Sequence, residues 1–265
     1  MVLLLHASHK VAFITGVSRG IGLALTKNLI AQGIHVVGVS RLDAQRMKEI
    51  LIHPDFYYIS ADVTTAVGLQ HIRQYIEDNR LSFDVVVHNA GVMMEPQIIE
   101  KLSYDDMERV INTNLMAPMK LTHMLIPYCN MHAKMLFITS RAATTAVAQV
   151  VPYCVSKAGL NMLVRILQQE IPHEKIAIAL AIPGEVDTAM QEILRNTPSF
   201  ALWTIFASNY QQNKLISPDV CAKFLTWLLC DTSARLFAQD EPWDIYDSKY
   251  HVNWLSGHLP ESPFT

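Results

Sequence analysis

Short runs of apolar residues alternate along the chain with longer segments in which apolar positions recur about every 3.6 residues. The short runs are typical of parallel strands buried on both faces, and the longer segments predict helices. The predicted strands span residues 10–15, 34–39, 56–60, 83–88, 134–139 and 175–182. The predicted helices span residues 20–32, 43–52, 64–79, 103–129 and 152–170. This alternation predicts an α/β fold with a doubly wound, mostly parallel sheet and helices on both faces.

No internal repeat, low-complexity tract or linker interrupts this pattern. We therefore expect residues 1–265 to form a single domain. Two segments depart from the strand and helix alternation, one at about 185–215 and the other a tail at about 239–265. The first is expected to cover a ligand, and the last strand of the sheet is not recognisable in the second.

Composition narrows the class of protein. Hydrophobic residues make up 51% of the chain, which is enough for a sizeable core, and the formal net charge is −3. This charge gives no reason to expect a nucleic-acid or membrane partner. The apolar run at residues 2–5 is shorter than a signal-peptide core, and no apolar stretch reaches the roughly 20 residues that a bilayer requires.

The four cysteines have neither the spacing of a disulfide framework nor that of a zinc site. No metal is expected, and reduced thiols favour a cytoplasmic location.

Glycine residues cluster directly after the first predicted strand and before the first predicted helix. The turn contains Gly16, Ser18, Arg19, Gly20, Ile21 and Gly22, with the spacing G-x-x-x-G-x-G. Such a turn lets the backbone approach a diphosphate at the N-terminus of a helix, so it predicts cofactor binding. The alternative is a turn with a purely structural role.

The end of the second predicted strand reads Ser40 and Arg41, with no acidic residue at its tip. An acid at this place would bind a ribose 2′-hydroxyl, whereas an arginine accommodates a 2′-phosphate. Arg19 is expected to approach the same phosphate from the glycine turn. The pattern favours NADPH over NADH, and the alternative is that both arginines are ordinary surface residues.

Tyr153 and Lys157 are four residues apart on a predicted helix, so their side chains share one face. Tyrosine transfers protons poorly at neutral pH unless a nearby cation favours the phenolate, and Lys157 supplies such a cation. The alternative is a pair at the surface of the helix.

Together these motifs resemble the short-chain dehydrogenase/reductase family of the single-domain type, with matches from residue 15 to residue 188. The resemblance implies one NAD(P)-binding Rossmann-fold domain. Further positions where the family places cofactor contacts are Asp62, Val63, Asn89, Ala90, Gly91, Pro183, Gly184, Val186 and Thr188. Asn114 and Ser140 also stand where the family has catalytic residues.

The resemblance implies a role for each catalytic position. Tyr153 protonates the carbonyl oxygen as a hydride arrives, Ser140 hydrogen-bonds the same oxygen, and Lys157 binds the nicotinamide ribose. Asn114 holds a water that relays protons to the lysine. Alternatively, Ser140 is a turn residue and Asn114 relieves a helix distortion near Pro118.

A finer resemblance concerns residues 16–20 and 183–191, which are similar to the sepiapterin reductase and benzil reductase branch. That branch reduces vicinal dicarbonyls with NADPH, so the expected function is reduction of a ketone or aldehyde. Two alternatives stay open. One is alcohol oxidation on a lipid or steroid substrate, and the other is a non-catalytic NADP(H)-sensing protein.

Residues beyond the motifs concern the substrate and the assembly. Glu185 is expected either to face the substrate or to be a solvated loop carboxylate. An aromatic series at Phe200, Trp203, Phe206 and Tyr210 predicts one aromatic helix face, as an apolar lid, internal packing or a subunit contact. The tail, which is rich in Trp and His with few helix signals, is expected to pack on a neighbouring subunit. The family resemblance also implies a homodimer or homotetramer through the helices at 103–129 and 152–170.

Overall fold

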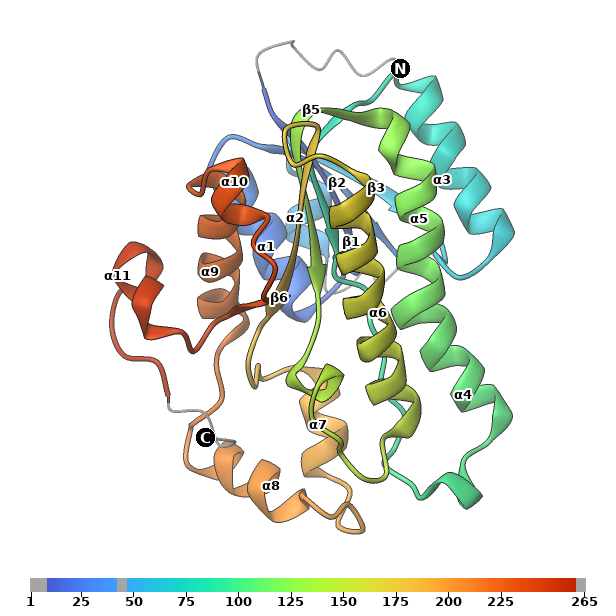
Figure 1. Cartoon of the computed structure of the whole chain (residues 1–265), viewed down its shortest axis with the longest axis vertical. Coiled ribbons are helices and arrows are strands. Elements are labelled where there is room, and N and C mark those ends of the chain that lie inside the picture. The colour runs from blue at the N-terminus through green and yellow to red at the C-terminus, as the bar shows by residue number, and fades with distance from the viewer. Residues whose placement is uncertain (1–8, 42–46, 261–265) are drawn as a thin grey trace.

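The computed structural model describes residues 9–41 and 47–260. Seven parallel strands form one sheet in the order β3-β2-β1-β4-β5-β6-β7. This order confirms the predicted doubly wound α/β architecture (Figure 1). The strands are β1 (Val11–Thr15), β2 (His35–Ser40), β3 (Phe56–Ser60), β4 (Phe83–His88), β5 (Cys129–Ile138), β6 (Ile176–Ile182) and β7 (Trp243–Asp244).

Helices cover both faces of the sheet. One face packs against α1 (Gly20–Ala31) and α9 (Pro218–Cys230), and the other against α3 (Ala66–Asp78), α5 (Ala117–Leu125) and α6 (Val151–Glu170). Alternate strand residues enter two separate hydrophobic clusters, so Ile14 lies in one and its neighbour Phe13 in the other. Over residues 9–41 and 47–260, no helix is both long and apolar enough to cross a bilayer.

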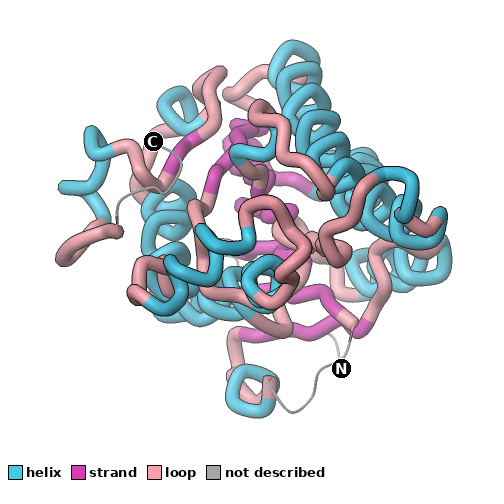
Figure 2. Tube along the Cα trace, turned by 90° about the horizontal axis from the view of Figure 1, so that it is seen from below, coloured by secondary structure: helices cyan, strands magenta, loops and turns pink. Residues whose placement is uncertain are grey.

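The elements near the carboxyl ends of the strands complete the fold. These are α7 (Ala189–Arg195) and α8 (Trp203–Gln211), which lie below the sheet in Figure 1 and over its strands when the molecule is seen from below (Figure 2). The short helices α2 (Lys48–Leu51), α10 (Ala234–Phe237) and α11 (His251–Trp254) lie at the periphery. The helix predicted at 43–52 is borne out in α2, and most of its first half lies outside the described residues.

Strand β5 begins at Cys129, five residues before the predicted start at residue 134. Cys129 pairs with Phe83, and the register then shifts before Val85 pairs with Lys134. A search for apolar runs misses this irregular first part of the strand, because it contains polar residues.

The helix predicted at 103–129 is interrupted. Ser103 caps α4 (Tyr104–Ile111) by accepting a hydrogen bond from the Asp106 amide at 3.1 Å. A π-helical segment, Asn112–Met116, then separates α4 from α5. Pro118 at the start of α5 lacks an amide hydrogen, which is consistent with a change of hydrogen-bond pattern directly before it.

Residues 243–254 of the tail pack against β6 and α9 of the same chain. Strand β7 is only two residues long, and it pairs with β6 through Trp243 opposite Ala181 and Asp244 opposite Ile182. Beyond it, Trp227 of α9 contacts the ring of Trp243 at 5.5 Å and the ring of Tyr250 at 5.6 Å between centroids. This aromatic packing, rather than a glycine-rich strand motif, fastens the tail to α9.

One buried lysine joins α9 to the sheet. The ammonium of Lys134 in β5 donates hydrogen bonds to the carbonyls of Leu228 at 3.0 Å, Leu229 at 2.9 Å and Thr232 at 2.6 Å. The side chain is nearly inaccessible to water. A cation at the C-terminus of a helix is favoured by the helix dipole, and here it also satisfies carbonyls that the helix leaves unpaired.

We expect Lys134→Met to lower the free energy of unfolding by about 2–4 kcal/mol, because buried carbonyls lose their donor while the apolar stem is kept. Urea denaturation followed by circular dichroism measures this change. Lys223→Met, at an exposed position of α9, is the matched control and should change the stability by less than about 0.5 kcal/mol. Equal unfolding midpoints for both variants would contradict the role of Lys134.

Candidate active site

A cavity of about 1080 Å³ lies at the carboxyl edge of the sheet, where ligands bind in doubly wound folds. The structure brings most of the predicted site residues to its walls. They are Gly16, Ser18, Arg19, Gly20, Ile21, Gly22, Ser40, Arg41, Asp62, Val63, Asn89, Ala90, Gly91, Tyr153, Lys157, Pro183 and Thr188. The remaining predicted residues, which do not line the cavity, are Asn114, Ser140, Gly184, Glu185 and Val186.

The glycine turn leaves the N-terminus of α1 open to the cavity. A side chain at Gly22 would meet the carbonyl oxygen of Gly16 at 2.2 Å, and Gly16 has a φ of +76°. The amide of Asn89 closes the turn from the β4 side, because its Nδ2 donates to the carbonyls of Thr15 at 2.9 Å and Gly16 at 3.2 Å. This cradle fits the diphosphate of a dinucleotide, which needs close backbone approach and a helix N-terminus.

Two arginines and the Asp62 carboxyl border the cavity near the end of β2. Arg19 and Arg41 are both exposed and both line the cavity. Burial raises the pKa of the Asp62 carboxyl, but hydrogen bonds from Thr64 and the charge of Arg41 outweigh it and hold this pKa below its ordinary value. The hydroxyl of Ser40 lies 3.2 Å from that of Tyr58. This corner of the cavity is therefore cationic at its rim.

Tyr153 lies in the first turn of α6 and is 8% exposed. Burial raises the pKa of its hydroxyl to about 12, although a hydrogen bond with the Ser140 side chain acts in the opposite direction. The hydroxyl of Ser140 also accepts a hydrogen bond from the Ala142 amide at 3.2 Å. Ser140 is thus both a turn residue and a partner of Tyr153, and Tyr153 carries its proton at neutral pH.

Lys157 lies one turn further along α6, and its ammonium stands 5.8 Å from the centre of the Tyr153 ring. It donates a hydrogen bond to the carbonyl of Ile138 at 2.8 Å. Burial lowers the pKa of Lys157 to about 8. Lys157 thus lies beside Tyr153, as their spacing predicts, and removal from water favours the neutral form of each group.

Asn114 lies in the π-helical segment and is buried. Its Oδ1 accepts a hydrogen bond from the Val92 amide at 2.8 Å, and its Nδ2 donates to the Val92 carbonyl at 3.0 Å and to the Ser156 hydroxyl at 3.2 Å. The side chain therefore braces the loop after β4 against α6, beside Lys157.

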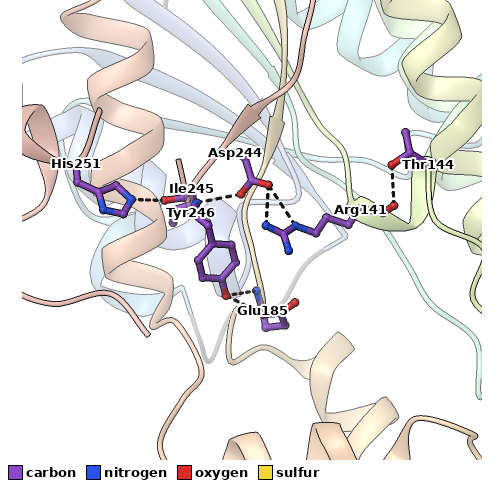
Figure 3. Close-up of polar contacts among 7 residues, drawn as sticks. All are labelled: Arg141, Thr144, Glu185, Asp244, Ile245, Tyr246 and His251. Atoms are coloured by element: carbon purple, nitrogen blue, oxygen red, sulfur yellow. Dashed lines mark hydrogen bonds and ion pairs between the residues drawn. The ribbon is translucent and has the colours of Figure 1, made fainter. Parts of the chain in front are cut away.

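Glu185 follows β6, and its carboxylate accepts a hydrogen bond from the hydroxyl of Tyr246 at 2.7 Å (Figure 3). Burial raises the pKa of this carboxyl above its ordinary value, against the effects of Tyr246 and Arg141. Glu185 is thus a partly buried group engaged by the tail and not a solvated loop carboxylate. Tyr246 was not singled out from the sequence, because no spacing links it to Glu185, 61 residues away.

The side of Tyr153 that faces α7 and α8 is apolar. Tyr153 shares a buried cluster with seven apolar residues, namely Met93, Met94, Val110, Val150, Leu194, Phe200 and Phe206. The rings of Phe200 and Phe206 lie 5.8 Å apart. These residues come from the loop after β4, from α4, from the residue before α6, and from the segment that the sequence predicted to cover a ligand.

The aromatic series does not form one helix face. Phe200 precedes α8 and Phe206 lies within it, and both side chains are buried in the apolar cluster. Tyr210 of the same helix is 48% exposed. The guanidinium of Arg195 in α7 stacks on the Tyr210 ring at 4.0 Å, and the carbonyl of Arg195 accepts a hydrogen bond from the Trp203 indole at 2.8 Å. Two aromatic residues therefore pack beside the site, and the other two join α8 to α7.

Comparison with known proteins agrees with this geometry. The model of the family described as short chain dehydrogenase matches residues 10–199. An uncharacterized oxidoreductase of Schizosaccharomyces pombe is 29% identical over 246 residues, which cover 90% of this chain and 98% of the relative. A benzil reductase ((S)-benzoin forming) of Saccharomyces cerevisiae is 30% identical over 237 residues, which cover 83% of this chain and 90% of the relative. The crystal structure of the KRED1-Pglu enzyme has a TM-score of 0.76 at 29% identity, covering 84% of this chain and 95% of that one.

Proposed function

Because the chain belongs to the short chain dehydrogenase family, we propose that it is an NADPH-dependent reductase of a ketone or aldehyde, with an α-diketone as the favoured substrate. One observation carries this proposal. The buried hydroxyl of Tyr153 stays protonated at neutral pH and has Ser140 as its hydrogen-bond partner. A protonated, positioned hydroxyl suits the donation of a proton to a carbonyl oxygen that is gaining negative charge.

The roles of the chain's own residues follow from their positions. The nicotinamide cofactor, when bound, supplies the hydride. Tyr153 donates its proton to the carbonyl oxygen of the substrate, and Ser140 donates a hydrogen bond to the same oxygen. The cation of Lys157 stabilises the phenolate that forms on Tyr153, and Asn114 holds the neighbouring loop and α6 together for the proton relay.

Residues at the glycine turn and beyond each strand would hold the cofactor. Gly16, Gly20 and Gly22 leave the space for its diphosphate, and Arg19 with Arg41 would bind a 2′-phosphate. Asp62 and Asn89 line the cavity between these regions. The two arginines, and the Ser40-Arg41 sequence that has no acid at the tip of β2, support NADPH over NADH.

The apolar cluster beside Tyr153 supports a bulky apolar substrate. Phe200 and Phe206 offer aromatic faces that favour aromatic rings over charged or strongly hydrated groups. The similar yeast protein is a benzil reductase by name. In a vicinal dicarbonyl the second carbonyl makes the reacting carbon electron-poor, so such a substrate requires mainly positioning and one proton donor.

We also propose a homodimer or homotetramer. Exposed apolar side chains of α6 follow one stripe, at Val151, Val155, Met162 and Ile166, with exposed fractions of 36% to 55%. Such a stripe is typical of a helix that packs against another subunit. The mass of the assembly in solution, measured by light scattering, tests this proposal, and a monomer at micromolar concentration would refute it.

A cytoplasmic location is proposed on the chemistry of the thiols. All four cysteines are free in the structure. Proteins that work in oxidising compartments commonly pair their cysteines. Microscopy of the tagged chain tests the location, and an organellar signal would refute it.

The first experiment follows the oxidation of NADPH with purified protein and a panel of aromatic α-diketones, a pterin with a dicarbonyl side chain, simple aldehydes and ketosteroids. We expect turnover of the α-diketones, and a loss of at least about 100-fold in kcat for Tyr153→Phe, because only the proton donor is removed. Binding of NADPH to this variant, measured by fluorescence titration, should remain. Tight NADPH binding without turnover of any carbonyl would instead favour the sensing role, and turnover retained by the variant would eliminate Tyr153 as the acid.

Arg41→Ala should reduce the preference for NADPH over NADH by about tenfold or more, since one charge-assisted hydrogen bond to the 2′-phosphate is lost. The two dissociation constants are measured by fluorescence titration. Arg235→Ala, at an exposed position of α10, changes the net charge equally and should leave the ratio unaltered. If the ratio is the same in both variants, the 2′-phosphate binds elsewhere.

The pH dependence of reduction should follow Lys157. Burial lowers the pKa of Lys157 to about 8 and raises that of Tyr153 to about 12, so Tyr153 remains an acid while Lys157 loses its charge first. We expect kcat/KM for NADPH to be constant below about pH 7 and to fall about tenfold per unit above about pH 8. Lys157→Arg, which stays charged, should move this fall to higher pH. A profile that is level up to pH 10 in the unaltered protein would contradict the assignment.

A further inference from the structure

Polar residues at or just beyond the ends of β5, β6 and β7 form one network that joins the tail to the two loops carrying predicted site residues. Arg141 directly follows Ser140, Glu185 follows β6, and Asp244 and Tyr246 belong to the tail (Figure 3). The four side chains do not line the cavity described above.

The carboxylate of Asp244 holds Arg141 and Tyr246 at once. One of its oxygens accepts hydrogen bonds from Nε and a terminal nitrogen of Arg141, at 3.2 and 3.0 Å. Its other oxygen accepts a hydrogen bond from the backbone amide of Tyr246 at 3.0 Å. The side chains of this ion pair are 29% and 25% exposed, so solvent screens it less than a pair at the open surface.

Tyr246 completes the network. Its hydroxyl donates a hydrogen bond to Glu185, and its ring lies under the guanidinium of Arg141 at 5.1 Å. The ring also lies close to Gly184, where an added side chain would meet it at 2.8 Å. A single tail residue therefore contacts both the loop after β5 and the loop after β6.

The tail is held in place by the sheet and by α9, so it can fix the positions of the side chains that contact it. Trp243 is 2% exposed, and β7 pairs with β6 on the sheet. The Ile245 amide donates to the carbonyl of Ile182 at 3.1 Å, and the ring of His251 contacts the carbonyl of Ile245 at 2.8 Å. The position of Asp244 and Tyr246 is thus set by the sheet and by the aromatic packing on α9.

We propose that Asp244 and Tyr246 are positioning residues for the proposed reduction, which hold the Ser140 turn and the Glu185 loop in their working orientation through Arg141 and Glu185. Ser140 depends on its turn, because its hydroxyl accepts from the Ala142 amide and its neighbour Arg141 is the residue tied to the tail. Hydrogen-bond donation to a carbonyl oxygen requires placement within about 0.5 Å. The inference rests on the proposed function only for the role of Ser140 in turnover.

Asp244→Asn and Tyr246→Phe test the proposal in the full chain. We expect each to lower kcat with the best carbonyl of the panel about tenfold, with the NADPH dissociation constant changed by less than about twofold, because a displaced positioning group costs rate and not cofactor affinity. Tyr128→Phe is the matched control. Tyr128 directly precedes β5, at the amino ends of the strands and away from the cavity, and its hydroxyl donates a 2.8 Å hydrogen bond to Glu77. The loss of this hydrogen bond should leave kcat unchanged.

Two variants of Glu185 separate positioning from a direct need for its charge. Glu185→Gln keeps an oxygen that accepts the Tyr246 hydrogen bond and should retain kcat within about threefold. In Glu185→Ala, kcat should fall by the same factor as in Tyr246→Phe. The double variant of Glu185→Ala and Tyr246→Phe should be no slower than either single one, since both remove the same contact. Additive losses would overturn the proposal.

Hydrogen exchange gives a readout that does not depend on turnover. In the Ser140 turn, the amides of Ala142, Ala143, Thr144 and Thr145 are hydrogen-bonded to Ser140 or Arg141. We expect these amides to exchange at least about threefold faster in Asp244→Asn than in Tyr128→Phe, whereas Tyr246→Phe keeps the ring beneath Arg141 and should have the smaller effect on this turn. If the unaltered protein reduces no carbonyl, the proposed function fails, and this exchange still decides whether the tail holds the turn. Unchanged exchange would overturn the inference, whatever the activity.

Discussion

The parallel pairing of β1 with β4 is the constraint on which the cofactor side of the molecule depends. It brings Thr15 beside Asn89, and the hydroxyl of Thr15 accepts hydrogen bonds from the amides of Asn89 at 3.1 Å and Ala90 at 3.0 Å. The Asn89 side chain returns two hydrogen bonds to the glycine turn. The two turns then approach so closely that Gly16 and Gly22 leave no room for a side chain. A backbone-lined cradle at a helix N-terminus is the result.

Burial shapes the chemistry on the other side of the cavity. Tyr153 and Lys157 are held away from water by α6 and the apolar cluster, and desolvation moves both groups toward their neutral forms. The consequence is a tyrosine that keeps its proton and a lysine whose charge is easily lost. This state of the pair supports the proposed reduction, in which the tyrosine gives a proton to a carbonyl oxygen.

The substrate side draws on late parts of the chain. The family model matches residues 10–199, whereas Phe200 and Phe206 of the apolar cluster and Tyr246 of the tail lie beyond that range. The matched range thus contains the glycine turn, Tyr153 and most of the apolar cluster, and the less patterned C-terminal quarter adds two phenylalanines of that cluster and the tail network. This division is typical of folds that support many chemistries by variation in peripheral segments.

The sequence by itself determined the order of the strands and helices as far as β6, the glycine turn and the pairing of Tyr153 with Lys157, because each of these depends on periodicity or spacing within a few residues. Only the tertiary structure decided the two-residue strand β7, the hydrogen bonds of Lys134 to carbonyls at the end of α9 and the contact of Tyr246 with Glu185. The last two join residues 94 and 61 positions apart in the chain, and no local pattern marks them. It also decided how deeply Tyr153 and Lys157 are buried, which raises the pKa of the tyrosine and lowers that of the lysine. The physical reason is that hydration depends on everything packed around a group, whereas spacing reports only which groups are near in sequence.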